Sequence, residues 1–278
     1  MNWSTVVQAL AFAGASGLDA LDGQILLSRC LARPRSWLLA HDDAQLDAGQ
    51  RERFAAAVLR RRGGEPLAYL IGEKEFCGLL LHVERAVLIP RPETEHLVEW
   101  GLEILGRRPA DPAPLALDLG TGSGAIALAL KAALPSARVE AVDVDAQALR
   151  IAQGNAQRLA LDVRFQLSDW WRATEKRRFD LVLCNPPYVA KGDPHLAALA
   201  HEPALALTPG TSGLEALHKV IEGAPAHLRV TGWLLLEHGF DQAEAVRQLL
   251  HEHGLVDIQT RSDLAGLPRC SGARWLGQ

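Results

Sequence analysis

Residues 115–132 have the sequence LALDLGTGSGAIALALKA, in which an apolar run, a glycine-rich turn and an alanine- and leucine-rich segment follow one another. The apolar run is typical of a buried strand, and the alanines and leucines favour a helix. Glycines between them let the backbone approach a ligand closely, and the N–H groups at the helix start face whatever binds there. We therefore predict a strand, turn and helix of an α/β fold, with a ligand at the turn. This glycine turn consists of Gly120, Thr121, Gly122, Ser123 and Gly124.

A second apolar stretch, residues 137–142, is predicted to be a strand and is followed by Asp143. An acidic residue about 20 positions beyond such glycines typically binds ribose hydroxyls, so a nucleoside-containing cofactor is expected. Gly120, Gly122 and Ala125 also satisfy the dinucleotide pattern G-x-G-x-x-G/A, and this motif alone does not identify the cofactor. A tight turn that binds nothing is the simpler alternative.

The residues after a third predicted strand, residues 163–167, suit an adenine ring. Asp169 could accept a hydrogen bond from an exocyclic amine, and Trp170 could stack on the ring. Trp170 and Trp171 are adjacent, and adjacent tryptophans also occur in ordinary core packing. Trp170 is nevertheless our candidate for the adenine side of the site.

A four-residue segment, Asn185-Pro186-Pro187-Tyr188, follows the apolar residues 179–184, which we predict to be a fourth strand. Two successive prolines fix φ at about -65° and remove two backbone donors, so the segment is stiff and rich in acceptors. The Asn185 side-chain oxygen and the Pro186 carbonyl could accept one bond each from a planar NH2 group, while Tyr188 covers a face of the plane. We interpret this clamp as a site for an amide or an aminated base. A proline-rich turn without a ligand is the alternative.

The clamp distinguishes between the candidate cofactors. A hydride-transfer enzyme has no evident need for a rigid amine clamp, whereas the methyl donor S-adenosylmethionine accounts for both the glycine turn and the clamp. In open α/β sheets ligands bind beyond the carboxyl ends of the strands, where the first and fourth predicted strands would be neighbours. We therefore expect cofactor and clamp to meet there.

Further stretches of the chain carry a resemblance to a known family. They are residues 60–70 (RRRGGEPLAYL), 76–79 (FCGL), 88–95 (LIPRPETE), 168–170 (SDW) and 236–239 (LEHG), besides the glycine turn and the clamp. With these motifs the chain resembles, over nearly its whole length, the prokaryotic peptide chain release factor glutamine methyltransferases. Residues 90–95 discriminate best, because the clamp motif also occurs in adenine amine methyltransferases and in the sister enzyme for a ribosomal protein glutamine.

The resemblance implies a class I S-adenosylmethionine-dependent methyltransferase, which has an α/β, Rossmann-like fold with a mostly parallel seven-stranded sheet and a small N-terminal helical domain. The implied reaction methylates the side-chain amide nitrogen of the glutamine in the Gly-Gly-Gln motif of class I release factors. Residue by residue, the resemblance assigns the cofactor to the glycine turn, the ribose to Asp143, the adenine to Trp170 and the substrate to the clamp. Asn185 also counts among the expected cofactor contacts.

Two departures from the family pattern concern local packing rather than these residues. Cys77 stands where many relatives carry an aromatic residue, and residues 208–213 (TPGTSG) lack the Gly-Gly-x-Asp-Gly form.

The expected mechanism is direct displacement of the sulfonium methyl group by the glutamine amide nitrogen. Asn185 and Pro186 would hold the NH2 group in line, and two acceptors on its N–H bonds would raise the electron density on nitrogen. No histidine or carboxylate is compelled to act as a general base. His238 is more simply a structural histidine, and residues 251–253 (HEH) lack the spacing of a helical zinc pair, so no metal is expected.

Length and composition suggest two domains. With 278 residues and 48% hydrophobic content, we predict a helical substrate-recognition domain at residues 1–68, a β-hairpin linker at 69–90 and the methyltransferase domain at 91–278. In the first domain Asp43 is the expected cap of a helix that carries Phe54, Ala57 and Val58 on one face.

Charge and cysteine usage indicate the setting. The net charge of -4 disfavours direct binding of duplex nucleic acid. The four cysteines form no C-x-x-C pair, and we see neither a basic leader nor an apolar stretch long enough for a bilayer. We expect a cytoplasmic monomer that does not bind membranes.

Three functions remain open from the residues themselves. The first is methylation of a protein glutamine, in a release factor or a ribosomal protein. The second is methylation of adenine in nucleic acid with the same clamp. The third is a catalytically silent module that binds the cofactor and recruits a partner.

Overall fold

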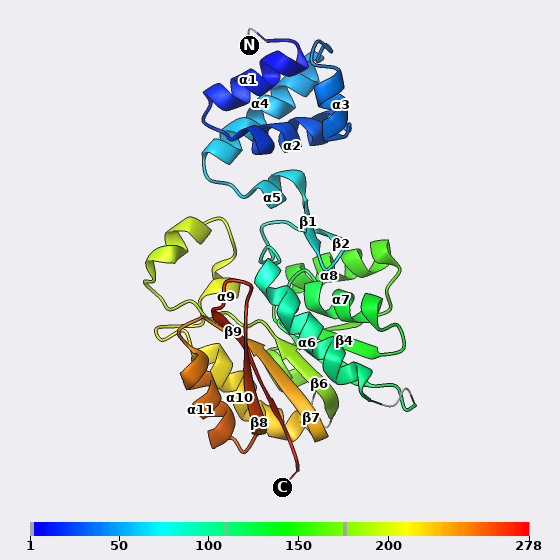
Figure 1. The fold of residues 1–278 in the computed structure, drawn as a ribbon, viewed down its shortest axis with the longest axis vertical. Helices are drawn as coiled ribbons and strands as arrows, with labels where there is room; N and C mark the ends of the chain where they lie inside the picture. The colour runs from blue at the N-terminus through cyan, green and yellow to red at the C-terminus, as the bar shows by residue number, and fades with distance from the viewer. Residues whose placement is uncertain (1–2, 109–110, 175–176, 278) are drawn as a thin grey trace. The chain divides into compact units, whose positions relative to one another are not determined.

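A computed structural model describes residues 3–108, 111–174 and 177–277 (Figure 1). The chain divides into two compact units, Met1–Glu73 and Lys74–Gln278. Each unit has its own hydrophobic core, so each is described by itself.

The first unit is helical. Its helices are α1 (Val6–Ala15), α2 (Ala20–Leu31), α3 (Arg35–Ala40), α4 (Ala48–Arg62) and α5 (Leu67–Ile71). Phe54 and Val58 of α4 are fully buried in its core, as their spacing predicts, and Ala57 is half-buried. The predicted cap Asp43 is wrong: Asp47 caps α4, because its side chain accepts from the Gln50 backbone N–H while the Gln50 side chain accepts from the Asp47 backbone.

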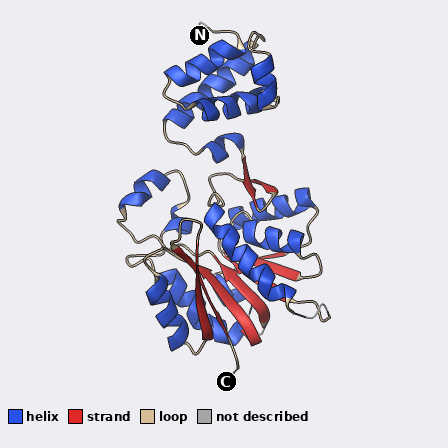
Figure 2. Ribbon diagram, in the orientation of Figure 1, coloured by secondary structure: helices blue, strands red, loops and turns tan. Residues whose placement is uncertain are grey.

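The second unit is an α/β fold built on a seven-stranded sheet of order β5-β4-β3-β6-β7-β9-β8 (Figure 2). The strands are β3 (Leu115–Leu119), β4 (Arg138–Asp143), β5 (Arg164–Leu167), β6 (Phe179–Cys184), β7 (Leu228–Glu237), β8 (Val256–Ser262) and β9 (Pro268–Arg274). Strands β3 to β7 pair in parallel, and β9 runs antiparallel to both of its neighbours. The predicted mostly parallel, Rossmann-like sheet is confirmed.

The central strands are buried on both faces, which is why their sequences are almost continuously apolar. In β3, Ala116 belongs to one hydrophobic cluster and Leu117 to the other, as expected for side chains that alternate across a sheet. Helices α6 (Glu95–Gly106), α7 (Ala125–Ala133) and α8 (Ala146–Leu159) contribute to the first cluster. Helices α10 (Glu215–His227) and α11 (Ala243–Glu252) contribute to the second and lie on the other side of the sheet in Figure 1.

Two predictions about strands need correction. From the sequence alone we expect edge strands near residues 255–261 and 273–276, but β9 lies between β7 and β8, because it pairs with each of them. Only β8 is at that edge, and β5 forms the other. The hairpin is also shorter than the predicted range of residues 69–90. It consists of β1 (Glu73–Phe76) and β2 (Leu79–His82), and Tyr69 lies in α5.

A close approach of β9 to its neighbours makes Gly272 sensitive to substitution. A Cβ atom there would lie 2.4 Å from Leu235 Cδ2 and 2.8 Å from the Trp100 ring, and both side chains are almost fully buried. We expect Gly272→Ala to lower the free energy of unfolding by about 1–3 kcal/mol, as overpacked cores do. Urea denaturation measures this.

Gly154 in α8 is the matched control, since a Cβ there would meet nothing within 4 Å. Gly154→Ala should leave stability equal or raise it by roughly 0.5–1 kcal/mol, because alanine favours helices. Equal stability of the two variants would contradict the packing explanation.

Within residues 3–108, 111–174 and 177–277, none of the helices combines the length and the hydropathy that crossing a bilayer requires.

Candidate active site

The glycine turn and the clamp follow two strands that are neighbours in the sheet. In the parallel pairing of β3 with β6, Leu119 lies opposite Cys184, and these are the last residues of the two strands. Gly120 and Asn185 therefore leave the same edge of the sheet side by side, as predicted.

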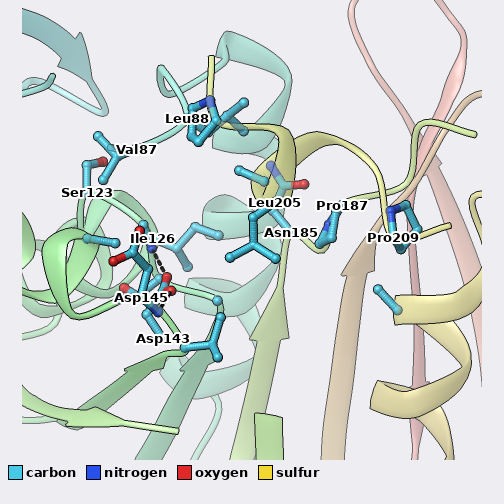
Figure 3. A pocket seen from close by; sticks show the side chains of 18 of the residues that line it. Val87, Leu88, Ser123, Ile126, Asp143, Asp145, Asn185, Pro187, Leu205 and Pro209 are labelled. Atoms are coloured by element: carbon cyan, nitrogen blue, oxygen red, sulfur yellow. Dashed lines mark hydrogen bonds between the residues drawn. The ribbon is translucent and has the colours of Figure 1, made fainter. Parts of the chain in front are cut away.

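A cavity of about 420 Å³ lies at this edge (Figure 3). Eight of the predicted site residues line it: Gly120, Thr121, Gly122, Ser123, Asp143, Trp170, Asn185 and Pro187. Three do not: Gly124, Pro186 and Tyr188. The structure thus brings together the cofactor turn, the acid, the aromatic ring and part of the clamp around one space.

Glycine is needed at the three glycine positions of the turn for different structural reasons. Gly120, Gly122 and Gly124 have φ values of 74°, 55° and 85°, a left-handed region that favours glycine. A Cβ atom on Gly122 would meet nothing within 4 Å, so this glycine leaves open space at the cavity. A Cβ on Gly124 would instead lie 3.0 Å from Leu128 and 3.2 Å from Ala152. Gly124 therefore permits close helix packing beside the site, and its predicted contact with a cofactor stays a prediction.

Asp143 at the end of β4 is tied to the glycine turn. Its Oδ2 accepts a hydrogen bond from the Gly122 N–H at 2.8 Å, and its Oδ1 accepts from the Asp145 N–H at 2.9 Å. Burial raises the pKa of Asp143, and these backbone donors oppose the rise. Each carboxylate oxygen can accept a second bond, which leaves capacity for two hydroxyl groups of a ligand.

The two adjacent tryptophans differ in what they contact. The Trp170 ring lies over the glycine turn, because a Cβ on Gly120 would be 3.7 Å from it. The Trp171 ring stacks on His227 with centroids 4.6 Å apart, and its Nε1 donates to the Lys219 carbonyl at 3.3 Å. Trp170 therefore belongs to the cavity and Trp171 to the packing outside it, a distinction that the sequence alone does not make.

The clamp is connected to two residues far from it in the chain. Asn185 Nδ2 donates to Thr94 Oγ1 at 3.1 Å, and Thr94 Oγ1 donates to Glu237 Oε2 at 2.6 Å. The Tyr188 hydroxyl donates to Glu237 Oε1 at 3.1 Å. Among the described residues, Asn185 Oδ1 has no hydrogen-bond partner. Tyr188 packs against the cluster that includes β7, so its predicted position over a substrate face remains a prediction.

Glu237 is the buried carboxylate under the clamp. Burial raises the pKa of Glu237, while the Thr94 and Tyr188 hydroxyls and the positive charge of Arg269 oppose that rise. Burial likewise raises the pKa of Tyr188, so its hydroxyl stays a donor. Glu237 lies in the motif of residues 236–239, and the sequence of that motif alone indicates no role for it.

The cavity rim is formed by residues that the sequence analysis gave no role. Arg91 forms an ion pair with Glu202, and Glu202 Oε2 accepts from the Ile89 N–H at 3.0 Å. Most of residues 86–91 line the cavity, as do residues of the segment 203–209, which contains the short helix α9 (Ala204–Leu207). The Leu88 and Leu205 side chains, labelled in Figure 3, are among these lining groups. These contacts join segments more than a hundred positions apart, and no local pattern predicts them.

Asp118 is a buried acid inside β3 that the sequence analysis missed as well. Its Oδ2 accepts from Thr121 Oγ1 at 2.6 Å and from the Ala127 N–H at 3.2 Å. Its Oδ1 has no partner among the described residues. Burial raises the pKa of Asp118 to about 7 from an ordinary value of 3.8. An acid in an otherwise apolar strand just before the glycines is the signal that could have identified it.

The raised pKa of Asp118 predicts a pH-dependent stability. Between pH 3.8 and about 7 the folded protein binds a proton that the unfolded chain has released, so stability falls as pH rises. Asp118→Asn cannot titrate. We expect the stability of the wild type relative to this variant to fall by roughly 1–3 kcal/mol from pH 5 to pH 8, measured by urea denaturation. Parallel pH profiles of the two proteins would contradict this.

His238 is a buried histidine whose two ring nitrogens both have close partners. His238 is fully buried, with Nε2 2.8 Å from Ser271 Oγ and Nδ1 2.8 Å from the Gly239 carbonyl, and burial lowers its pKa. It is therefore a structural histidine, as predicted. In the described part of the chain, no group of three or more histidine, cysteine, aspartate or glutamate side chains could hold a metal ion.

Known proteins are similar to this chain in fold and in sequence. Residues 105–257 match the family described as Methyltransferase small domain, and residues 4–72 match the PrmC N-terminal domain. A solved methyltransferase from Pyrococcus furiosus superimposes with a TM-score of 0.55 at 20% identity, covering 81% of this chain and 98% of that chain. A T. thermophilus 16S rRNA N2 G1207 methyltransferase in complex with AdoMet and guanosine gives 0.53 at 23% identity, covering 73% and 49%. At these identities the likeness supports the fold.

Fold and site together define a class I, S-adenosylmethionine-dependent methyltransferase. Two curated relatives are more specific. The release factor glutamine methyltransferase of Bordetella pertussis is 46% identical over 259 residues, 92% of this chain and 95% of that protein. The enzyme of the same name from Xylella fastidiosa (strain Temecula1) is 47% identical over 276 residues, 97% and 98%. The chain belongs to the release factor glutamine methyltransferase family.

The residues present fit S-adenosylmethionine. The cavity volume lies within the roughly 300–1,000 Å³ of small-molecule sites. Gly122 leaves open space at its wall, Asp143 retains acceptors for ribose hydroxyls, and Trp170 offers an aromatic face.

Proposed function

We propose that this protein transfers a methyl group from S-adenosylmethionine to the side-chain amide nitrogen of the glutamine in the Gly-Gly-Gln motif of class I release factors. The observation that carries the proposal is the Asn185 side chain, which lines the cavity of the glycine turn and whose amide nitrogen, bonded to Thr94, leaves the amide oxygen as an acceptor. An acceptor at that place suits a substrate group that donates hydrogen bonds, such as an NH2 group. Membership of the family supports the same substrate.

The clamp supplies orientation and polarisation. Asn185 Oδ1 and the Pro186 carbonyl each accept one N–H bond of the glutamine amide, which raises electron density on a nitrogen whose lone pair is delocalised. When bound, S-adenosylmethionine supplies a methyl group on a positively charged sulfur. The substrate nitrogen forms the new N–C bond as the C–S bond breaks, and one of its protons passes to solvent.

The remaining residues bind and enclose the reactants. We assign the cofactor to the glycine turn, its ribose to Asp143 and its adenine to Trp170. Pro187 and the apolar lining residues Leu88 and Leu205 limit access of water to the reacting atoms. Asn185 also contacts the cofactor, and Tyr188 covers a face of the substrate amide.

The same proposal includes the roles of the domains, the oligomeric state and the location of the protein in the cell. The helical domain, residues 1–68, recognises the substrate; residues 69–90 are the linker and residues 91–278 the methyltransferase domain. The protein acts as a cytoplasmic monomer without direct contact to nucleic acid or membrane.

Transfer of label from methyl-labelled S-adenosylmethionine tests the proposal. We expect labelling of a class I release factor and none of the same factor with its Gly-Gly-Gln glutamine changed to alanine. Duplex DNA and ribosomal proteins are the comparison substrates. Label in DNA would establish the adenine methyltransferase, label in a ribosomal protein the sister activity, and label in none the silent module.

A further inference from the structure

The hydrogen bonds beneath the clamp have a defined direction. Thr94, at the end of the 3-10 turn η1 (Pro92–Thr94), lies between Asn185 and Glu237, the last residue of β7. Thr94 and Glu237 are 4% and 1% exposed, so water does not compete for these bonds. Three segments that are distant in sequence thus meet at one hydroxyl group.

The chemistry of the three groups fixes which atom of Asn185 faces Thr94. A carboxylate only accepts, so the single hydroxyl proton of Thr94 goes to Glu237. Thr94 Oγ1 can then only accept from Asn185, and only the NH2 group of Asn185 can donate. The second hydroxyl donor, Tyr188, favours the carboxylate form of Glu237 that this direction requires.

An asparagine side chain has two orientations of nearly equal shape, related by a half turn of its amide. In one orientation the oxygen faces the cavity, where it accepts from a substrate N–H. In the other the NH2 group faces it, and two donors oppose each other. An asparagine at this place therefore acts as an acceptor only when a hydrogen-bond partner on the side away from the substrate selects the first orientation.

We infer that Thr94 and Glu237 are positioning residues that hold the Asn185 amide with its oxygen toward the substrate nitrogen. This inference rests on the proposed function. Thr94 lines the cavity and Glu237 does not, but the role inferred for both is to act on the substrate through Asn185. Pro186 offers a backbone carbonyl that needs no such selection, so the effect falls on one of the two acceptors.

Thr94→Val tests the inference, because valine keeps the shape of threonine and removes the hydroxyl. We expect kcat for release-factor methylation to fall at least about tenfold, about 1.4 kcal/mol of barrier. Cofactor affinity, measured by calorimetry, should change less than the turnover, because the lost hydroxyl bonds Asn185. Thr94→Ser restores the hydroxyl and should restore most of the turnover. Thr94→Ala, which cannot overpack, replaces the valine variant if that variant does not fold.

Thr260→Val is the matched control. The Thr260 hydroxyl also bonds another side chain, Ser271 Oγ at 2.9 Å, but Thr260 does not line the cavity. Loss of that hydroxyl should leave turnover unchanged.

A double-mutant cycle separates positioning from general structural damage. If Thr94 acts through Asn185, then Thr94→Val should cause no further loss of turnover in an Asn185→Ala background. A merely structural role would lower the turnover of both backgrounds by the same factor. Full turnover of Thr94→Val, or additive losses in the cycle, would overturn the inference.

A readout independent of turnover distinguishes failure of the inference from failure of the proposed function. In NMR spectra of protein labelled with 15N-asparagine, one Asn185 side-chain proton should carry the shift of a hydrogen-bonded amide and lose it in Thr94→Val. A wild type that shows this signal but does not label release factor would refute the function and not the orientation. A wild type that labels release factor without this signal would refute the orientation alone.

Discussion

Asn185→Ala is expected to lower the turnover of release-factor methylation at least about tenfold, about 1.4 kcal/mol of barrier, with cofactor binding largely intact. The variant removes the one acceptor that the Thr94 and Glu237 bonds aim at the cavity. With the Pro186 carbonyl alone, one N–H bond of the substrate amide lacks an acceptor, so the amide is oriented less well and its nitrogen is less polarised. Single-turnover kinetics with saturating release factor measure the chemical step, and calorimetry measures the cofactor affinity.

A suitable control for Asn185→Ala also loses a side-chain amide. Gln248 lies exposed on α11, and its Nε2 donates to Glu252 Oε1 at 2.8 Å. Gln248→Ala should keep wild-type turnover. Wild-type turnover of Asn185→Ala on release factor would remove the clamp from the mechanism.

The parts of the fold that follow from local sequence were predictable. The order of strand, glycine turn and helix in residues 115–132 is encoded within that stretch by apolar runs and helix-favouring residues. The neighbouring positions of β3 and β6 follow from the general topology of open α/β sheets. The place of β9 between β7 and β8 does not follow, because an antiparallel insertion depends on which distant strand offers the better pairing.

The site residues also include some that the sequence indicates and some whose role only the structure shows. Gly120, Gly122, Asp143 and Asn185 lie in short motifs whose residue types state their chemistry, and the structure places them around one cavity. Gly124 belongs to the same motif, yet its lack of a side chain serves packing against α8, which the motif does not reveal.

The long-range contacts could not be read from the sequence. Thr94 and Glu237 are 143 positions apart, and each lies in a stretch that the family motifs contain. Their bond becomes visible only when η1 and the end of β7 meet in the fold. The same holds for Arg91 and Glu202 at the rim. Sequence therefore indicates which groups react, and the fold indicates which groups orient them.

Asp143→Ala is expected to weaken the binding of S-adenosylmethionine at least about tenfold. Hydrogen bonds to a charged group contribute about 1.5–3 kcal/mol each, and 1.4 kcal/mol corresponds to a tenfold change of affinity. The variant also removes the acceptor of the Gly122 N–H, so the glycine turn loses its attachment to the end of β4. Isothermal titration with S-adenosylmethionine, without any protein substrate, measures this loss.

Asp263 provides the matched control for Asp143. Its Oδ1 accepts from the backbone N–H groups of Ala265 and Leu267, both at 3.0 Å, so Asp263 also holds a turn together. It does not line the cavity. Asp263→Ala should therefore lower the melting temperature without weakening the binding of S-adenosylmethionine. Asp143→Ala should weaken that binding more than any fall in its melting temperature explains. An Asp143→Ala protein that binds S-adenosylmethionine as tightly as the wild type would contradict the ribose assignment.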